Sequence, residues 1–435
     1  MNAQPKVQAA FDVQRIRADF PVLSRTVHDK PLVYFDNANT SQKPVPVIEA
    51  MNRHYRETNA NVARAVHQLG EESTAAFEGA RDKLARFINA TSRNELILTS
   101  GTTQSINLVA YSYALPRLQP GDVILTTVME HHANIVPWQL MAARTGAVVK
   151  AAPIDQRGEL ILEQFVAMLT PDVKLACVAH VSNVLGTVNP VREIARECRK
   201  RGIPLLVDGS QAVPHRPVDV QALGCDFYAL TGHKMLAPTG TGALWAKREH
   251  LEAMPPFFGG GEMIREVSFS GSTFAPPPHK FEAGTPNIAG FVGLGAAIDY
   301  YESIGFDAIH AQEQDLLHYA TERLRDIPGV RLFGEAAEKE AVISFLVEGA
   351  QATDLATLLD LQGVAVRSGH HCAHPLMQFF NVPATLRISL GAPSVSGRTP
   401  LPGWVASFFR GGGFTVAAGG VSFEVDPSPP RHQNS

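Results

Sequence analysis

The sequence has few cysteines, no long apolar run and little net charge, and each absence excludes a class of protein. The cysteines lie far apart without any CxxC pair, which argues against a disulfide framework and a structural zinc site; they are Cys177, Cys198, Cys225 and Cys372. No run of about 18 apolar residues occurs and the first residues are charged throughout, so we predict neither a membrane span nor an export signal. The formal net charge of −4 comes from scattered residues, which argues against a surface for nucleic acid or an anionic membrane. We therefore expect a cytoplasmic protein that acts on a small molecule.

Apolar sequence is abundant and regularly arranged. With 435 residues, 45% of them hydrophobic, the chain is longer than one core usually absorbs, so we expect two domains. Residues 73–90 carry apolar side chains at helical spacing, and short apolar runs then alternate with helical patterns. This order predicts βα units and a mostly parallel sheet, with functional loops at the carboxyl ends of its strands. After about residue 300 the order becomes helix, strand, helix, strand, which predicts a smaller α+β domain.

Two residues at predicted strand ends suit an imine-forming cofactor site. Lys234 ends the stretch DFYALTGHK, where a turn among small residues can desolvate its amine and let it form an imine. Most lysines, however, are solvated surface charges. Asp208 closes the apolar run PLLVD, and a carboxylate buried there needs a cationic partner such as a protonated pyridine nitrogen. The alternative for this aspartate is an ordinary helix N-cap.

Three further segments follow predicted strands in the same way. In LTSGTTQSINLVA, Thr102 and Thr103 open a helix, so backbone N–H groups and hydroxyls either hold a phosphate or simply cap the helix. TVMEHHANIVPWQ offers His131 and His132; an imidazole can stack on a pyridine ring, although a lone histidine is more often structural. AHVSNVLGT places Asn183 in an equivalent loop. The succession of phosphate turn, histidine, asparagine, aspartate and lysine predicts pyridoxal 5′-phosphate (PLP) bound to the lysine.

The segment AVRSGHHCAHPLM contains a candidate nucleophile. The Cys372 thiol lies beside imidazoles and near Arg367, a setting that favours the reactive thiolate where the thiol is accessible. We expect no metal site, because His370, His371 and Cys372 are consecutive and adjacent side chains in an extended loop point apart. In the apolar strand LRISL, a buried Arg387 needs an anionic partner, either a substrate carboxylate or an internal salt bridge.

Several segments together form a recognisable set: GTTQSINLVA, MEHHANIVPWQ, HVSNVLGT, VDGSQAV, TGHKMLAPTG, GGGEMI, FEAGTPN and RSGHHCA. With them the chain resembles the group II (SufS-type) cysteine desulfurases and selenocysteine lyases of the class V aminotransferase family. The resemblance runs from RADFPVLSR near the start to RISLGA near residue 392. It implies an α/β, fold-type I PLP-dependent architecture, in which a large domain has a mostly parallel seven-stranded sheet and a smaller domain is α+β.

The resemblance also implies a role for each residue at the strand ends. Lys234 would be the Schiff-base lysine, Asp208 the partner of the pyridine nitrogen, His131 the stacking imidazole that also assists proton transfer, and Cys372 the sulfur acceptor. The ring oxygen would be contacted by Gln211 and Asn183, and the phosphate by Thr102, Thr103, Thr231 and His233. The substrate contacts would be Arg387, Arg367 and Asn183.

The implied reaction converts L-cysteine to L-alanine and leaves the sulfur as a persulfide on the enzyme, for iron–sulfur cluster assembly. Thr285 would reach the phosphate bound by the other subunit, so a homodimer is implied. The expected sulfur acceptor is a protein of the SufE/SufU type. Alternatives within the same chemistry are a selenocysteine lyase acting on L-selenocysteine, a cysteine sulfinate desulfinase, and another PLP lyase or epimerase. An alternative of another class is an inactive scaffold in a sulfur-transfer complex.

We expect four parts along the chain. Residues 1–33 would be an N-terminal segment that packs with the small domain, and residues 34–299 the large PLP-binding domain. Residues 300–410 would form the small α+β domain, and residues 411–435, which are rich in proline, glycine and serine, a poorly ordered tail.

The sequence departs from the family pattern at three places. Ala63, Arg64 and Ala65 stand where relatives have His-Arg-Gly, and Asn39 stands where alanine is usual, close to the expected substrate position. After Ala392, a glycine- and proline-rich segment replaces the Tyr-Asn-Thr turn and amphipathic helix of relatives. Such a composition is poor for a helix. Our hypothesis for this end is a shifted reading frame or a replaced terminus.

Overall fold

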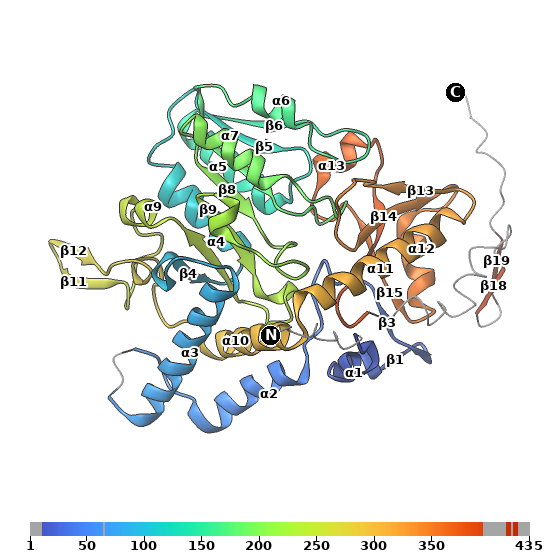
Figure 1. Ribbon diagram of the computed structural model, residues 1–435, viewed down its shortest axis with the longest axis horizontal. Coiled ribbons are helices and arrows are strands. Elements are labelled where there is room, and N and C mark those ends of the chain that lie inside the picture. Colours follow the sequence, from blue (N-terminus) through green and yellow to red (C-terminus); the bar gives the residue numbers. More distant parts are fainter. Residues whose placement is uncertain (1–10, 64–65, 395–414, 419–420, 425–435) are drawn as a thin grey trace, which may run out of the picture.

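The computed structural model describes residues 11–63 and 66–394, together with the backbone of 415–418 and 421–424. Its centre is a seven-stranded sheet with the strand order β4-β10-β9-β8-β7-β5-β6 (Figure 1). Neighbouring strands run parallel, except that β10 is antiparallel to both β4 and β9. The predicted mostly parallel sheet is therefore confirmed. In sheet order the strands are β4 (Leu96–Thr99), β10 (Gly242–Ala246), β9 (Phe227–Thr231), β8 (Leu205–Asp208), β7 (Val173–Ala179), β5 (Val123–Thr127) and β6 (Val148–Ala152).

The sheet is buried on both faces, which explains the continuous apolar runs of its strands. Alternate side chains point to opposite faces, so that Leu96 and Leu98 of β4 join one apolar core and Ile97 the other. The first core is covered by α2 (Val45–Arg53), α3 (Gln68–Phe87), α6 (Leu162–Ala167), α7 (Val191–Lys200), α8 (Val220–Leu223) and α10 (Ile288–Ile304). The second core is covered by α4 (Thr102–Leu108), α5 (Val136–Thr145) and α9 (Arg248–Ala253).

Helix α3 contains most of the helix predicted for residues 73–90, but it begins earlier, at Gln68, and ends at Phe87. The early start has a local cause, because the His67 side chain accepts a hydrogen bond from the backbone N–H of Gly70 and so caps the first turn. A histidine is an uncommon cap, and the apolar spacing alone did not reveal it.

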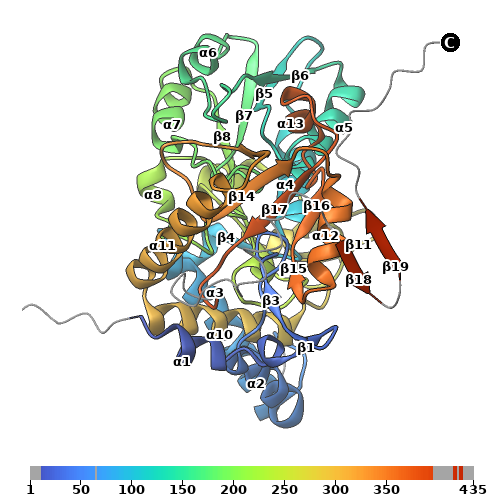
Figure 2. The ribbon, with the colours of Figure 1, turned by 90° about the vertical axis from the view of Figure 1, so that its right-hand side faces the viewer.

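A second, four-stranded antiparallel sheet lies beside the first in Figure 1 and faces the viewer in Figure 2. Leucines of α11 (Phe306–Arg325) and α12 (Ala352–Asp360) pack against apolar side chains of this sheet, such as Ile343 and Phe345, in one core. Strand β3 (Val33–Tyr34) pairs with β15 (Val364–Ala365), so the N-terminal segment contacts this part of the chain, while the domain boundaries stay predictions. The strands of the second sheet are β13 (Val330–Phe333), β14 (Val342–Val347), β17 (Thr385–Ser389) and β16 (Arg367–Gly369).

Smaller elements complete the described residues. The hairpin of β11 (Ile264–Ser268) and β12 (Gly271–Phe274) projects away from the rest of the molecule (Figure 1). Among the described residues, no helix has the length and apolar character to cross a membrane. Most of the segment after Ser394, including most of the predicted tail, lies outside the described residues. The remaining elements are α1 (Val13–Ala18), β1 (Thr26–Val27), β2 (Lys30–Pro31), α13 (His374–Phe379), β18 (Thr415–Ala418), β19 (Val421–Glu424), the 3₁₀ turns Pro21–Ser24, Arg93–Glu95, His132–Asn134, Gly232–Lys234 and His279–Phe281, and the π-helical turns His54–Thr58 and Val109–Ala114.

Candidate active site

A cavity of about 250 Å³ lies at the carboxyl ends of β5, β7, β8 and β9. Its other side is lined by residues of the second sheet and of the loop between β16 and α13. This is the edge of the sheet at which functional loops were predicted. Thr285 does not line this cavity. The other predicted site residues all do: Lys234, Asp208, His131, Thr102, Thr103, Asn183, Gln211, Thr231, His233, Arg367, Arg387 and Cys372.

Lys234 is held on the single 3₁₀ turn that follows β9. Burial lowers the pKa of its amine from 10.5 to about 8, although the nearby Asp208 carboxylate acts in the opposite direction. The carbonyl oxygen of the preceding residue, His233, accepts a hydrogen bond of 2.9 Å from Lys43 Nζ. The turn is thus anchored, and its lysine is a much better nucleophile at neutral pH than a solvated one.

Asp208 is buried at the end of β8 and is connected to the predicted phosphate turn through Ser210, a residue that sequence reasoning missed. The Asp208 Oδ1 atom accepts a hydrogen bond of 2.9 Å from the backbone N–H of Ser210. The Ser210 hydroxyl lies 2.5 Å from the same oxygen and 2.6 Å from Thr102 Oγ1. Gly101 begins that turn with φ 147°, and a Cβ there would lie 3.3 Å from Thr231 Oγ1. The turn therefore presents a close-packed polar cradle that favours glycine.

His131 reaches the cavity from the loop after β5. Burial and the charge of Lys234 lower the pKa of its imidazole to about 4, so the ring is neutral near pH 7. Its Nδ1 atom accepts a 3.0 Å hydrogen bond from Ala133 N, which leaves the proton on Nε2. Behind it, the fully buried Glu130 accepts hydrogen bonds from Asn134 Nδ2 (2.6 Å) and from the backbone of β7 at Ala179 (3.0 Å).

Glu130 therefore joins the ends of two neighbouring strands and supports the His131 loop. Burial raises the pKa of Glu130 to about 7. The sequence shows only a glutamate next to the histidine pair, and no spacing in it signals this role.

The loop between β16 and α13 carries Cys372, whose side chain is partly exposed. Both His371 and Cys372 have left-handed backbone angles, with φ of 52° and 57°. Two hydrogen bonds hold this conformation: the Cys372 carbonyl accepts one from His132 N at 2.7 Å, and the His371 carbonyl accepts one from Asn183 Nδ2 at 2.8 Å. The strained loop thus presents the thiol to the cavity, and one of the Asn183 amide protons is already used for this purpose.

The other three cysteines are buried, as expected for structural thiols. Cys177 lies in β7 and Cys198 in α7, while Cys225 precedes β9. Burial raises the pKa of Cys177 well above its ordinary value, and it raises the pKa of Cys198 and of Cys225 to about 12. Cys372 is the one cysteine that lines the cavity.

Arg387 has the internal partner that one of its two interpretations predicted, and it also lines the cavity, while its contact with a substrate carboxylate stays a prediction. Its Nη2 donates to Asp36 Oδ1 and its Nη1 to the Asn183 carbonyl, both at 3.0 Å. Its buried Nε has no hydrogen-bond partner in the described part of the chain. Burial lowers the pKa of Arg387 to about 10, so the guanidinium stays charged at neutral pH. Asn39, one of the departures from the family pattern, donates to the other oxygen of Asp36 at 3.1 Å and lines the cavity.

Thr285 lies in a different place from the other predicted residues. It lines a separate pocket of about 260 Å³ together with Ala63 and Phe258. Ala63, the one described residue of the departure at 63–65, has a left-handed φ of 56°. Within a single chain, Thr285 therefore takes no part in the cavity.

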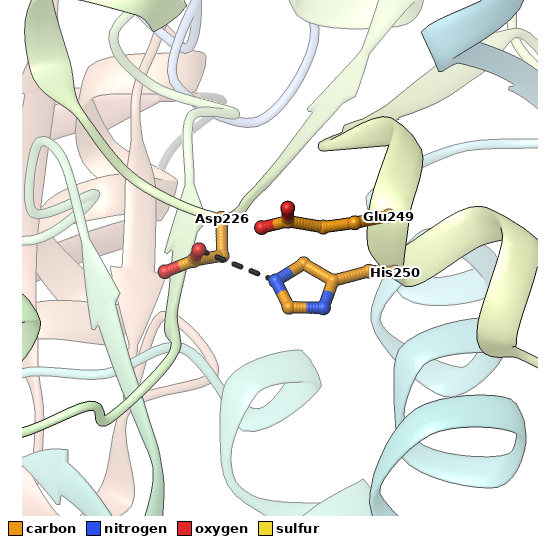
Figure 3. Close-up of side chains that lie close together, drawn as sticks. All are labelled: Asp226, Glu249 and His250. Carbon is orange, nitrogen blue, oxygen red and sulfur yellow. Dashed lines mark hydrogen bonds and ion pairs between the residues drawn. The ribbon is translucent and has the colours of Figure 1, made fainter.

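A second group of polar side chains lies apart from the cavity and consists of Asp226, Glu249 and His250 (Figure 3). Asp226 Oδ1 accepts hydrogen bonds from Lys247 Nζ at 2.6 Å and from His250 Nε2 at 3.2 Å. The lysine already neutralises the carboxylate, and the His250 ring stacks on Phe227. Asp226, Lys247 and His250 are therefore interpreted as a structural ion-pair network.

Comparison with known proteins agrees with this geometry. The α/β fold with a lysine and an aspartate at adjacent strand ends is that of the fold-type I PLP-dependent enzymes. A probable cysteine desulfurase of Xylella fastidiosa is 62% identical over 390 residues, which are 90% of this chain and 94% of that one. The structure of the cysteine desulfurase CsdA from Escherichia coli is similar, with 38% identity and a TM-score of 0.83, over 89% of this chain and 96% of that one. The structure of a cysteine desulfurase from Thermococcus onnurineus NA1 is similar too, with 36% identity and a TM-score of 0.86, over 91% and 98% of the chains.

Residues 33–395 match the family model described as Aminotransferase class-V. The chain belongs to the class V aminotransferase family, and its curated relatives at 48–62% identity are named cysteine desulfurases. The predictions of the class V aminotransferase family and of the fold are therefore confirmed, while the group II assignment stays a prediction.

Proposed function

We propose that this protein is a PLP-dependent cysteine desulfurase of the group II type, which converts L-cysteine to L-alanine and takes the sulfur onto Cys372. One observation carries the proposal. A single cavity contains a lysine with a lowered pKa, a buried aspartate, a buried arginine and the only cysteine that is not buried. Each of these residue types suits one part of the reaction.

The residues of the cavity fit PLP. Lys234 would hold it through Nζ, and the buried Asp208 carboxylate would keep a proton on the ring nitrogen. The close-packed turn at Gly101–Thr103, with the Thr231 hydroxyl and His233, is a polar cradle for a phosphate. When bound, PLP supplies an electron sink for a carbanion at the substrate Cα.

The chain's own side chains would then orient the substrate and move its protons. Arg387 binds the substrate carboxylate, because its buried charge is only partly compensated by Asp36. Lys234 Nζ accepts the Cα proton, since its lowered pKa leaves a usable fraction of free amine. The Cys372 thiolate attacks the substrate sulfur, so that an S–S bond forms as the Cβ–S bond breaks. One proton added at Cβ and one returned to Cα by Lys234 Nζ then give L-alanine. The neutral His131 is positioned to pass a proton through Nε2.

The lowered pKa of Lys234 gives a testable pH dependence. The rate at which cofactor-free protein captures added PLP is expected to rise with pH and to level off above about 8. The reason is that the neutral amine is the nucleophile, and burial makes it available at lower pH than in a solvated lysine. The measurement is the growth of yellow absorbance after mixing, over a pH series. A rate that keeps rising up to the ordinary lysine pKa of 10.5 would contradict the proposed environment of Lys234.

A homodimer is part of the proposal. Phe269 at the tip of the β11–β12 hairpin is fully exposed, and Val267 in β11 is also an exposed apolar side chain. Large exposed apolar residues on a projecting element favour a partner surface. Thr285, which lies outside the cavity of its own chain, would then complete the phosphate site of the second copy.

Replacing Thr285 by alanine is therefore expected to leave the chain folded and to weaken PLP retention. One lost hydrogen bond to a charged group corresponds to roughly a 10-fold to 100-fold lower affinity. The measurement is the PLP content after dialysis, with Thr357→Ala on the exposed face of α12 as the control. Light scattering should give the mass of two chains. A monomer that holds PLP as firmly as before the substitution would refute the shared site.

The acceptor of the sulfur and its use in the cell are part of the same proposal. The partly exposed Cys372, with the exposed His370 and His374 beside it, would pass its sulfur to an acceptor protein of the SufE/SufU type, for iron–sulfur cluster assembly in the cytoplasm. Alanine release from L-cysteine and from L-selenocysteine by a Cys372→Ala variant distinguishes this function from that of a selenocysteine lyase.

A further inference from the structure

A chain of hydrogen bonds runs from Lys234 into the interior of the protein, away from the substrate side of the cavity. Lys234 Nζ lies 3.4 Å from Gln211 Oε1, and Gln211 Nε2 lies 2.9 Å from His215 Nε2. His215 Nδ1 lies 2.8 Å from Glu313 Oε2 on α11, 98 residues along the chain. Gln211, His215 and Glu313 are each at most 3% exposed. His215 and Glu313 are therefore shielded from bulk water, and their polar atoms are satisfied by each other and by Gln211.

The directions of these hydrogen bonds are fixed by chemistry. An amide nitrogen can only donate, so Gln211 donates to His215 Nε2, which must be the unprotonated ring nitrogen. The proton of the neutral His215 ring is then on Nδ1 and is donated to the Glu313 carboxylate. In this arrangement Gln211 turns its carbonyl oxygen, an acceptor, towards the Lys234 amine.

A bound cofactor would require the opposite arrangement. If Gln211 contacts the anionic ring oxygen of PLP, it must present its NH₂ group there as the donor. The amide then turns its carbonyl oxygen towards His215 Nε2, and two facing acceptors repel unless the ring nitrogen carries a proton. With Nδ1–H still donated to Glu313, the pair has to gain one proton from solution and becomes an imidazolium facing a carboxylate.

The charged groups around His215 and Glu313 favour the binding of this extra proton. Burial would lower the pKa of His215, but the charge of Glu313 and the hydrogen bond to it raise the pKa above its ordinary value. Burial raises the pKa of Glu313, against the effect of His215. The buried Glu340 faces both residues and acts in the same direction on each, while Lys234 opposes a charge on His215 and His310 lowers the pKa of Glu313.

Arg216, the residue after His215, is a further charged group near this pair. Its Nε lies 3.3 Å from Glu340 Oε1 and so compensates part of the negative charge. The buried carboxylates of Glu313 and Glu340 can therefore balance the positive charge of a protonated His215.

We infer that His215 and Glu313 are positioning residues that determine which end of the Gln211 amide faces the cavity, and that they take up one proton when the cofactor binds. This inference rests on the proposed function, because it assumes that the ring oxygen of PLP lies against Gln211. The site therefore includes a residue of α11, and its occupancy is linked to the protonation of a group that touches neither cofactor nor substrate.

Glu313→Gln tests the inference, because the neutral side chain keeps the shape of the pair and removes its need for a proton. A glutamine can donate to Nδ1 or accept from it, so the neutral His215 ring suits either orientation of Gln211. The cofactor-free full-length protein is titrated with PLP in a calorimeter, in buffers of different ionisation enthalpy, which gives the number of protons taken up per site. Wild type is expected to take up about one proton more than Glu313→Gln near neutral pH. The matched control, Glu322→Gln on the exposed face of α11, should behave as wild type.

A second variant keeps the inference testable if the Glu313→Gln protein does not fold. His215→Asn removes the titrating ring, and it should lower the proton uptake by the same amount as Glu313→Gln. Equal proton uptake by wild type and by either variant that still binds PLP would overturn the inference while leaving the proposed function intact. A wild-type protein that binds no PLP would overturn both.

Discussion

Lys234→Ala is expected to give a protein that folds but shows no internal-aldimine absorbance after PLP has been added and the excess removed. The amine of Lys234 is the group in the cavity that is placed and activated for imine formation, with a pKa lowered to about 8. Without it, the covalent attachment and the base for the Cα proton are lost together. Turnover of L-cysteine should therefore fall by at least roughly 10²-fold to 10⁴-fold, the usual contribution of a positioned acid–base group.

The experiment compares visible spectra and alanine release with those of Lys150→Ala. Lys150 lies on the edge strand β6, is half-exposed and forms only a long ion pair with Asp172, so its loss should change neither property. Since Lys234 is partly enclosed, its truncation leaves a small void, and a thermal melt should show little loss of stability. A yellow Lys234→Ala protein with near-normal turnover would require another lysine to hold the cofactor.

Cys372→Ala is expected to abolish persulfide formation from L-cysteine and to reduce alanine release from it by roughly 10²-fold or more, as for other removed nucleophiles. The reason is exposure and position, because the other three thiols are buried and kept in the thiol form by their raised pKa. The variant should stay yellow, since no cofactor role is assigned to Cys372. The control is Cys198→Ala in α7, which lies outside the cavity.

The same variant separates the competing functions. If alanine release from L-selenocysteine persists in Cys372→Ala while that from L-cysteine is lost, the protein has a thiol-independent lyase activity on the better leaving group. A scaffold would act on neither substrate even in the wild-type form with PLP bound. Turnover of L-cysteine by Cys372→Ala at the wild-type rate would contradict the persulfide mechanism.

Sequence reasoning identified those parts of the site that depend on local pattern. Asp208 ends one continuous apolar run and Lys234 lies on the turn just after another, and such runs become buried parallel strands whose carboxyl ends meet at one edge. The Thr102 turn and the His131 loop were found for the same reason. Cys372 was found through its unusual histidine-rich segment, which needs no tertiary information.

The supporting contacts could not be predicted in this way, because they join residues that are distant in sequence. Asp36 meets Arg387 across 351 positions, and Glu313 meets His215 across 98. No periodicity relates the two members of such a pair, and each looks like an ordinary charged residue until the chain has folded. The early start of α3 was missed for a different reason, because it depends on the rotamer of His67.

The most direct test of sulfur transfer to Cys372 is mass spectrometry of the Cys372 peptide after a brief reaction of the wild-type protein with L-cysteine. We expect one added sulfur atom on Cys372, none on Cys177, Cys198 or Cys225, and release of L-alanine in equal amount during the first turnover. Alanine formed without any sulfur on Cys372, or a persulfide on one of the buried cysteines instead, would contradict it.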